Sequence, residues 1–137
     1  MKIAVIDGQG GRIGQMLVSA IKKEGLSCTL RAIGTNSTAT AAMMKAGADE
    51  GATGENPVIV ACRQADVIIG PLGILVADGL LGEITPAMAA AVGQSAAKKL
   101  LLPLNLCSNI VVGTQSLSVS ALISETVKLL KDLINNQ

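Results

Sequence analysis

Residues 2–14 read KIAVIDGQGGRIG and carry the strongest structural signal in the chain. Residues 2–7 form a nearly continuous apolar run, which is typical of a central parallel strand buried on both faces. Glycines follow at once, and apolar residues then recur at helical spacing from Ile13 until a stop at Gly25. A strand that turns through glycines into a helix is the opening of a Rossmann-like nucleotide-binding fold.

The glycine loop predicts a phosphate site. Glycines allow a tight turn and let the backbone approach a pyrophosphate, whose charge is met by N–H groups and by the positive end of the helix dipole. The spacing is G-x-x-G-x-x-G, because Ile13 stands where the third glycine of G-x-G-x-x-G would be. The alternative is that the glycines only make a turn and close helix–strand packing. The residues expected to bind the cofactor are Gly8, Gln9, Gly10, Gly11, Arg12, Ile13 and Gly14.

Strand and helix signals alternate along the rest of the chain, which predicts a parallel sheet. Further strands are expected at 28–34, 67–70, 100–104 and 110–112, with only a stub of strand in a mobile loop at 47–54. Further helices are expected at 37–46, 56–64, 85–92 and 118–134, with caps at Ser37, Asn56, Thr85 and Ser118. The expected fold class is α/β, a Rossmann-like three-layer α/β/α arrangement with a mostly parallel sheet, in one domain spanning residues 1–137.

The composition is unusually apolar. Hydrophobic residues make up 50% of the chain and charged residues only 15%, where globular domains average about 25%. Part of this apolar surface is expected to be hidden in a homo-oligomer, most simply a dimer, with residues 72–81 as the candidate interface. The alternative is that the same segment lines a ligand cleft.

Several functional classes are excluded by what the sequence lacks. It has no Phe, Tyr or Trp and a net charge of +1, which argues against nucleic-acid binding. It has no His, which excludes the Ser-His-Asp triad and the usual zinc ligands, so no metal site is expected. No apolar run approaches the ~20 residues that cross a bilayer, and the first run is too short for a signal peptide. No membrane partner and a cytoplasmic location are therefore expected.

The end of the second predicted strand bears on which nucleotide binds. Dinucleotide-binding folds usually carry an Asp or Glu there to hold the ribose, but this strand ends in Gly34-Thr35-Asn36-Ser37. With no acid to repel a ribose phosphate, Arg12 and the side chains of Thr35, Asn36 and Ser37 could accept one. The sequence thus favours NADP over NAD within the wider class of phosphate-bearing nucleotides. The alternative is that Asn36 and Ser37 merely cap the next helix.

Other candidates lie near the predicted carboxyl edge of the sheet, where ligands of open α/β folds bind. Gly70, Pro71 and Gly73 follow a strand and could line the cleft, or could form an ordinary connecting turn. Glu83 is the candidate general acid or base, with a helix-flanking carboxylate as the alternative.

Two further candidates follow the strand expected at 100–104. Asn105 could orient a ligand and Cys107 could act as a nucleophile. Without His, activation of that thiol would fall to Lys98, Lys99 or a helix N-terminus. The alternative for each of the three cysteines is a small buried apolar side chain.

The sequence resembles two known protein families. Residues 3–14, and Arg12 in particular, resemble the opening of dihydrodipicolinate reductases, Rossmann enzymes that use NADP or NAD. The chain lacks the second, substrate-binding domain and the histidines of those reductases, so their activity does not carry over. Over residues 1–113 the chain is similar to a bacterial family of short Rossmann-like proteins of unknown function, in the segments DGQGGRIG, GTNSTATAAMMKAGADEGATGEN, DVIIGPLGI, LGEITPAMA and LPLN.

The second resemblance implies the fold and brings no activity. Two functional hypotheses therefore stay open. One is a nucleotide-binding, oxidoreductase-like module that uses NADP. The other is a non-catalytic, oligomeric sensor or interaction protein that keeps the Rossmann shell. Whether the chain is an enzyme is left open by its residues.

Overall fold

The computed structural model describes residues 1–104, 106–114 and 117–137. Its centre is a five-stranded sheet in the order β3-β2-β1-β4-β5, and each neighbouring pair of strands runs parallel. The strands are β1 (Lys2–Asp7), β2 (Thr29–Gly34), β3 (Glu50–Thr53), β4 (Val67–Pro71) and β5 (Lys98–Leu102). The predicted parallel sheet is confirmed.

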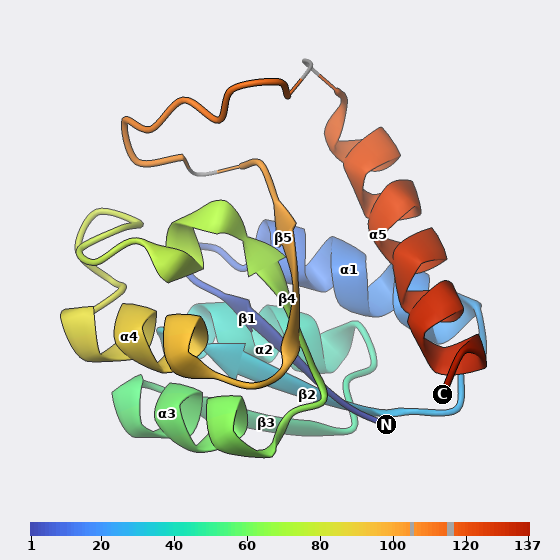
Figure 1. The fold of residues 1–137 in the computed structure, drawn as a ribbon. Helices are drawn as coiled ribbons and strands as arrows, with labels where there is room; N and C mark the ends of the chain where they lie inside the picture. The colour runs from blue at the N-terminus through green and yellow to red at the C-terminus, as the bar shows by residue number, and fades with distance from the viewer. Residues whose placement is uncertain (105, 115–116) are drawn as a thin grey trace.

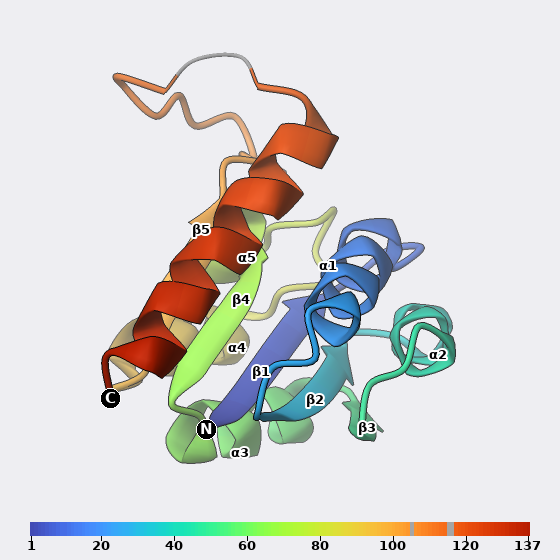
Figure 2. The same ribbon diagram turned by 90° about the vertical axis from the view of Figure 1, so that its right-hand side faces the viewer.

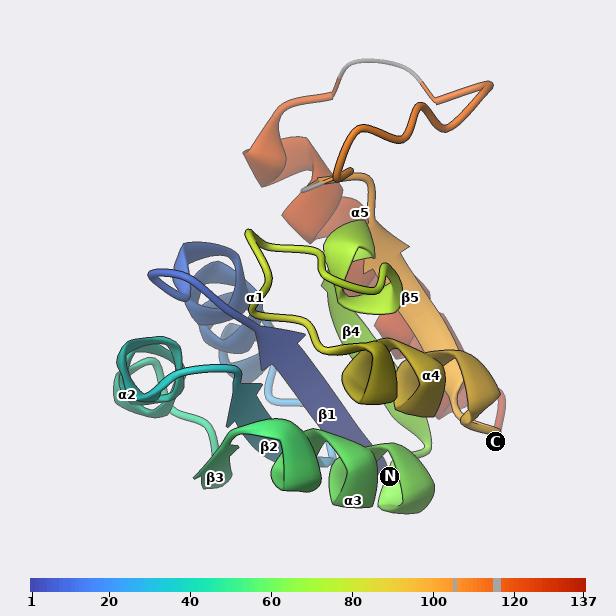
Figure 3. The ribbon, with the colours of Figure 1, turned by 90° about the vertical axis from the view of Figure 1, so that its left-hand side faces the viewer.

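Helices cover both faces of this sheet, which confirms the three-layer arrangement (Figure 2). One face packs against α1 (Arg12–Lys23), α2 (Ser37–Lys45) and α5 (Val119–Asn135). The other face packs against α3 (Glu55–Gln64), α4 (Pro86–Gln94) and the short 3₁₀ turn η1 (Leu72–Leu75), which are turned toward the viewer in Figure 3.

The alternation of side chains along each strand builds two cores. In β1, Ile3 and Val5 belong to the core under α1 and α5, whereas Ala4 and Ile6 belong to the core under α3 and α4. All four are at most 2% exposed. A strand buried on both faces has no place for polar side chains, which is why β1 reads as a continuous apolar run.

The helix ends follow the sequence signals with two corrections. Ser118 and Thr85 cap α5 and α4 as predicted, through hydrogen bonds of 3.1 Å to Ala121 N–H and Met88 N–H. The cap of α2 is Asn36 rather than Ser37, and the cap of α3 is Gly54 rather than Asn56. Gly54 has φ 109°, so its backbone begins the helix two residues before the predicted cap.

Two strand predictions also need correction. The last strand lies at 98–102 and not at 100–104, because it forms the edge of the sheet, where lysines are tolerated and protect against further strand pairing. The strand expected at 110–112 is absent from the described segment 106–114. Ile110 and Val112 are 89% and 95% exposed, so no sheet or core holds that apolar triplet.

The order of the strands fixes where a ligand can bind. β1 lies between β2 and β4, and the connections after β1 and β4 lead to helices on opposite faces (Figure 1). A crevice opens at the carboxyl ends of two such strands in open α/β sheets. The glycine loop and the β4–α4 connection flank this point.

Among the described helices, none combines the length and the apolar composition that crossing a membrane requires.

Candidate functional site

The glycine loop is a tight turn that ends at the start of α1. Gly11 N–H donates to the Gly8 carbonyl at 2.9 Å, and α1 begins at Arg12. Gln9 has φ 50°, a left-handed conformation that favours glycine, whereas Gly10 lies outside that region. The strained backbone conformation is therefore at Gln9, whereas the neighbouring Gly10 has a conformation that any residue can adopt.

Three of the four loop glycines have a structural reason to be glycine. A Cβ at Gly8 would lie 2.5 Å from Thr35 Oγ1, and one at Gly14 would clash with Met43 Sδ. Gly11 combines φ 72° with a Cβ position only 2.6 Å from Ala39 Cα. A Cβ at Gly10 would meet nothing within 4 Å. Turn and packing thus account for Gly8, Gly11 and Gly14 but not for Gly10.

Asp7 holds the loop from inside. Its carboxylate is 3% exposed and accepts hydrogen bonds from Gly8 N–H at 2.8 Å and Gly14 N–H at 2.7 Å. Burial raises the pKa of Asp7 and outweighs the lowering by these two bonds, while the charge of Glu83 raises it further. Asp7 therefore satisfies two donors of the loop and leaves the remaining donors for other partners.

The outer surface of the loop carries N–H groups that have no acceptor among the residues that the structure describes. The described hydrogen bonds use none of the amides of Gly10, Arg12 and Ile13. The Arg12 side chain is exposed, and no ion pair involves it among the described residues. Ile13 is half-buried and packs on the core. Arg12 is the first residue of α1, so its charge and these N–H groups belong to the positive end of that helix.

Glu83 reaches this loop from the β4–α4 connection. Its Oε1 accepts from Gln9 N–H at 3.0 Å, from Thr35 Oγ1 at 2.7 Å and from Asn36 Nδ2 at 2.6 Å. Its burial raises the pKa, but the bonds from Thr35, Gln9 and Asn36 together lower it below its ordinary value. Glu83 is thus an ionised carboxylate that joins the glycine loop to the end of β2.

This contact overturns the premise of the NADP preference. That preference rested on the absence of an acid at the end of β2, and Thr35 and Asn36 are indeed not acidic. The folded chain nevertheless brings the Glu83 carboxylate within 2.7 Å of both side chains. Asn36 also caps α2 through Oδ1, with a bond of 2.9 Å from Ala39 N–H, so the capping alternative holds as well.

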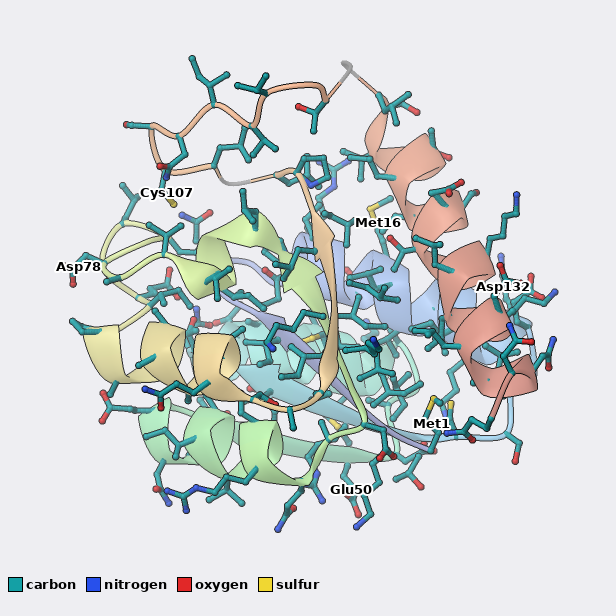
Figure 4. All side chains as sticks on the ribbon, viewed as in Figure 1. Met1, Met16, Glu50, Asp78, Cys107 and Asp132 are labelled. Carbon is teal, nitrogen blue, oxygen red and sulfur yellow. The ribbon has the colours of Figure 1, made fainter. Side chains whose placement is uncertain are left out.

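A hollow of about 380 Å³ lies beside the loop. Residues from the glycine loop, the β4–α4 connection and the segment after β5 line it, and Figure 4 shows Asp78 and Cys107 on the same side of the molecule. Every non-glycine residue with positive φ in the described chain lines this hollow: Gln9, Asp78, Leu80, Leu81, Cys107 and Ser108. Such backbone strain costs about 1–3 kcal/mol per residue and gathers at functional sites.

Several other predicted residues lie away from this surface. Gly70, Pro71 and Gly73 are buried, and a Cβ at Gly70 would clash with the Ile6 carbonyl oxygen. Gly70 and Pro71 are the last two residues of β4, and Gly73 lies in the 3₁₀ turn η1 that follows. Ser37 is exposed and forms the first residue of α2. Asn105 lies outside the described residues.

The cysteines occupy different environments. Cys107 is half-buried and lines the hollow with φ 52°. Cys62 is buried, and desolvation raises its pKa to about 11. Burial also raises the pKa of Cys28. Over the described ranges, no three Cys, Asp or Glu side chains gather where they could hold a metal ion.

The candidate interface at 72–81 is divided between the core and the surface. Ile74 and Leu80 are buried in the core under α4, and residues 78–81 line the hollow beside the glycine loop. Leu81 is 96% exposed and Leu75 is 36% exposed.

Sequence reasoning missed Asp7 and the strained connection at 78–82. Asp7 had a signal, because an acid that ends a fully apolar strand just before a helix is placed to satisfy the first N–H groups of that helix. The connection had none, since Leu80 and Leu81 are residues that rarely adopt positive φ.

Comparison with known proteins gives one family and a distant structural likeness. A family model described as "Domain of unknown function (DUF3842)" matches residues 2–135. No curated protein matches the sequence. Among solved structures, a dodecameric FMN-dependent UbiX-like decarboxylase from Escherichia coli O157:H7 is 15% identical, with 98% of this chain and 95% of that chain covered and a TM-score of 0.46. A likeness at this level says nothing about the ligand or the assembly of the present chain.

Proposed function

The chain belongs to the family described as Domain of unknown function (DUF3842), and we propose that it binds a phosphate-bearing nucleotide at its glycine loop. The observation that supports this most is the open amide surface of the loop. The N–H groups of Gly10, Arg12 and Ile13 have no acceptor among the described hydrogen bonds. A phosphate offers oxygens that such donors bind at a helix N-terminus.

Three features make this surface suited to an anion. Gly10 is exposed and has no packing role, so a ligand can approach its backbone closely. Arg12 adds a full positive charge that no described acid neutralises. Asp7 already holds Gly8 N–H and Gly14 N–H, which fixes the loop before a ligand arrives.

The neighbouring hollow gives the rest of a nucleotide a place to lie. Its volume of about 380 Å³ falls within the roughly 300–1,000 Å³ of small-molecule sites. Gln9 belongs both to the glycine loop and to the lining of the hollow, so the two sites are continuous.

The proposal is one of binding and names no reaction. The hydrogen bonds from Thr35, Gln9 and Asn36 outweigh burial and hold the pKa of Glu83 below its ordinary value, so this carboxyl carries no proton to donate near neutral pH. Of the two roles considered for Glu83, general acid or general base, the lowered pKa favours the general base. We propose nucleotide binding and assign no reaction to the chain.

The test is a titration of the whole chain with nucleotides. Thermal shift and calorimetry with NAD, NADP, flavin mononucleotide, ATP, GTP and S-adenosylmethionine should identify at least one phosphate-bearing ligand. Gly10→Val should fold normally, because no atom lies within 4 Å of the new Cβ, and should weaken binding at least tenfold. Ser19→Val, at an exposed position of α1, is the control. Failure of the five phosphate-bearing ligands to bind at millimolar concentration would contradict the proposal, whether or not S-adenosylmethionine binds.

Self-association is a second candidate function. Leu81, Ile110 and Val112 are 96%, 89% and 95% exposed, and their loops both contribute to the hollow. Large contiguous apolar patches are typical of interaction surfaces, and these side chains would have to form one for the two loops to be such a surface. Light scattering at micromolar concentration should then give a mass above that of one chain, and a monomer would remove this candidate.

A further inference from the structure

The two oxygens of Glu83 have unequal environments. Oε1 accepts three hydrogen bonds, from Gln9 N–H, Thr35 Oγ1 and Asn36 Nδ2, between 2.6 and 3.0 Å. Oε2 has one described contact, of 3.2 Å, to the same Gln9 N–H. A carboxylate oxygen has two lone pairs, so Oε1 is saturated and Oε2 still has acceptor capacity.

The position of this carboxylate is set by two strand ends. Oε1 would lie 3.2 Å from a Cβ built on Gly8, which directly follows β1, and it contacts Thr35, which directly follows β2. In dinucleotide-binding folds this is where an acid at the end of the second strand accepts the hydroxyl of the ribose. Here the acid arrives from the β4–α4 connection, 48 positions later in the chain than Thr35.

We propose that Glu83 reads the ribose of the bound nucleotide, accepting its free 2′-hydroxyl and excluding a 2′-phosphate. This inference rests on the proposed nucleotide site and adds its selectivity. A hydroxyl can donate to Oε2, whereas a phosphate has only acceptor oxygens at neutral pH and would lie against a like charge. The chain should therefore prefer NAD to NADP, the reverse of the expectation from the residues that end β2.

The substitution Glu83→Gln separates these two effects. A glutamine carbonyl oxygen can still accept from Gln9, Thr35 and Asn36, so the loop stays joined to β2. Its amide nitrogen then replaces Oε2, whose one described contact is the 3.2 Å bond from Gln9 N–H, and puts a donor in place of an acceptor, which suits a phosphate. Glu125→Gln removes the same charge at an exposed position of α5 and serves as the matched control.

The experiment is calorimetry on the wild type and both variants with two ligand pairs. One pair is NAD and NADP, and the other is adenosine 5′-monophosphate and adenosine 2′,5′-bisphosphate, which differ only in the 2′-phosphate. The wild type and Glu125→Gln should bind the 2′-hydroxyl member of each pair at least tenfold more tightly. Glu83→Gln should reduce that ratio to within about threefold, mainly by tightening the 2′-phosphate ligands.

The outcomes distinguish the inference from the proposed site. If the wild type binds both members of each pair equally, or if Glu83→Gln leaves the ratio unchanged, the selectivity role is wrong while the nucleotide site stands. Binding of the 2′-phosphate ligands alone would mean that Glu83 swings away to admit an anion, and would also overturn the inference. If no nucleotide binds, the proposed site itself is wrong. Thermal unfolding of Glu83→Gln shows whether the variant is folded in each case.

Discussion

Glu83 accepts a hydrogen bond of 2.7 Å from the hydroxyl of Thr35, across 48 positions of the chain. The same carboxylate accepts from Gln9 N–H, across 74 positions. One side chain thus ties together the end of β2, the glycine loop and the β4–α4 connection. That connection also carries Leu80 and Leu81, whose left-handed backbone costs about 1–3 kcal/mol per residue.

The first prediction concerns the pH dependence of stability. Although burial raises the pKa of Glu83, the bonds from Thr35, Gln9 and Asn36 give it a net lowering in the folded chain. Because the pKa is lower in the folded chain, the ionised side chain stabilises the fold at any pH above the pKa of Glu83 in the unfolded chain, about 4.5. This stabilisation is lost as the pH falls through the folded pKa. The wild type should therefore melt at a higher temperature than Glu83→Gln at pH 7, and the difference should shrink as the pH falls below the unfolded value and through the lowered folded pKa.

Asp7 changes the stability of the fold in the opposite direction as the pH rises, and most of this effect is common to the wild type and Glu83→Gln. Burial raises the pKa of Asp7, so its contribution to stability is lost as pH rises through the folded pKa. Asp7 is present in both the wild type and Glu83→Gln, so its effect cancels in the difference except for the smaller part that comes from the charge of Glu83. Circular dichroism melts between pH 3 and 8 measure this difference. A difference that stays constant over that range would show that the charge of Glu83 plays no part.

The second prediction concerns Gly14 in the first turn of α1. Helix propensity alone would favour alanine there by about 1 kcal/mol. The new Cβ, however, would clash with Met43 Sδ and lie 3.0 Å from the Asp7 Cβ. Overpacking of this kind costs about 1–3 kcal/mol, so Gly14→Ala should lower the free energy of unfolding.

Denaturant unfolding checks the second prediction with two partner variants. Gly10→Ala should change stability by less than about 0.5 kcal/mol, because no atom lies within 4 Å of the new Cβ. Met43→Ala combined with Gly14→Ala should be less destabilising than the sum of the two single changes, since the clash is then removed. Simple additivity would show that the cost of Gly14→Ala lies elsewhere.

Local sequence signals predicted most of the fold and, within the site, the glycine loop. β1, α1 and α5 followed from periods of apolar residues that each element must bury, and the caps Thr85 and Ser118 followed from short polar signals. The glycine loop followed in the same way. β5 was displaced by two residues because an edge strand need not be apolar throughout.

The contacts that Glu83 makes with the glycine loop and with the end of β2 are not predicted by any local sequence pattern. Glu83 reaches the glycine loop only because the β4–α4 connection folds back through left-handed residues at 78, 80 and 81. Leucine at two of those positions contradicts local preference, so a sequence reading has no basis for expecting the turn. The end of β2 therefore looked free of acids in the sequence, although Glu83 lies against it in the fold.

The third prediction concerns the charge at the start of α1. Arg12 is exposed and pairs with no described acid, so Arg12→Ala should leave the melting temperature within about 1 °C of the wild type. A charge-assisted contact to phosphate contributes about 1.5–3 kcal/mol, so the same change should weaken a bound nucleotide roughly ten- to a hundredfold. Lys23→Ala removes an equal charge from the last turn of the same helix and should leave the affinity unchanged. Equal losses in both variants would point to a general charge effect and not to a contact at the loop.

The fourth prediction uses Cys107 to report on the hollow. Cys107 and Gln9 line the same hollow, so a nucleotide that lies there should cover the thiol. We expect a saturating nucleotide to slow iodoacetamide modification of Cys107 at least fivefold, as measured by mass spectrometry of the peptides. Cys28 is half-buried and absent from the lining of the hollow, so its rate should not change, and Cys62 is buried with its pKa raised to about 11 and should stay unmodified. If calorimetry shows a nucleotide bound while the rate at Cys107 is unaltered, the nucleotide does not lie in the hollow, and the phosphate site is separate from it.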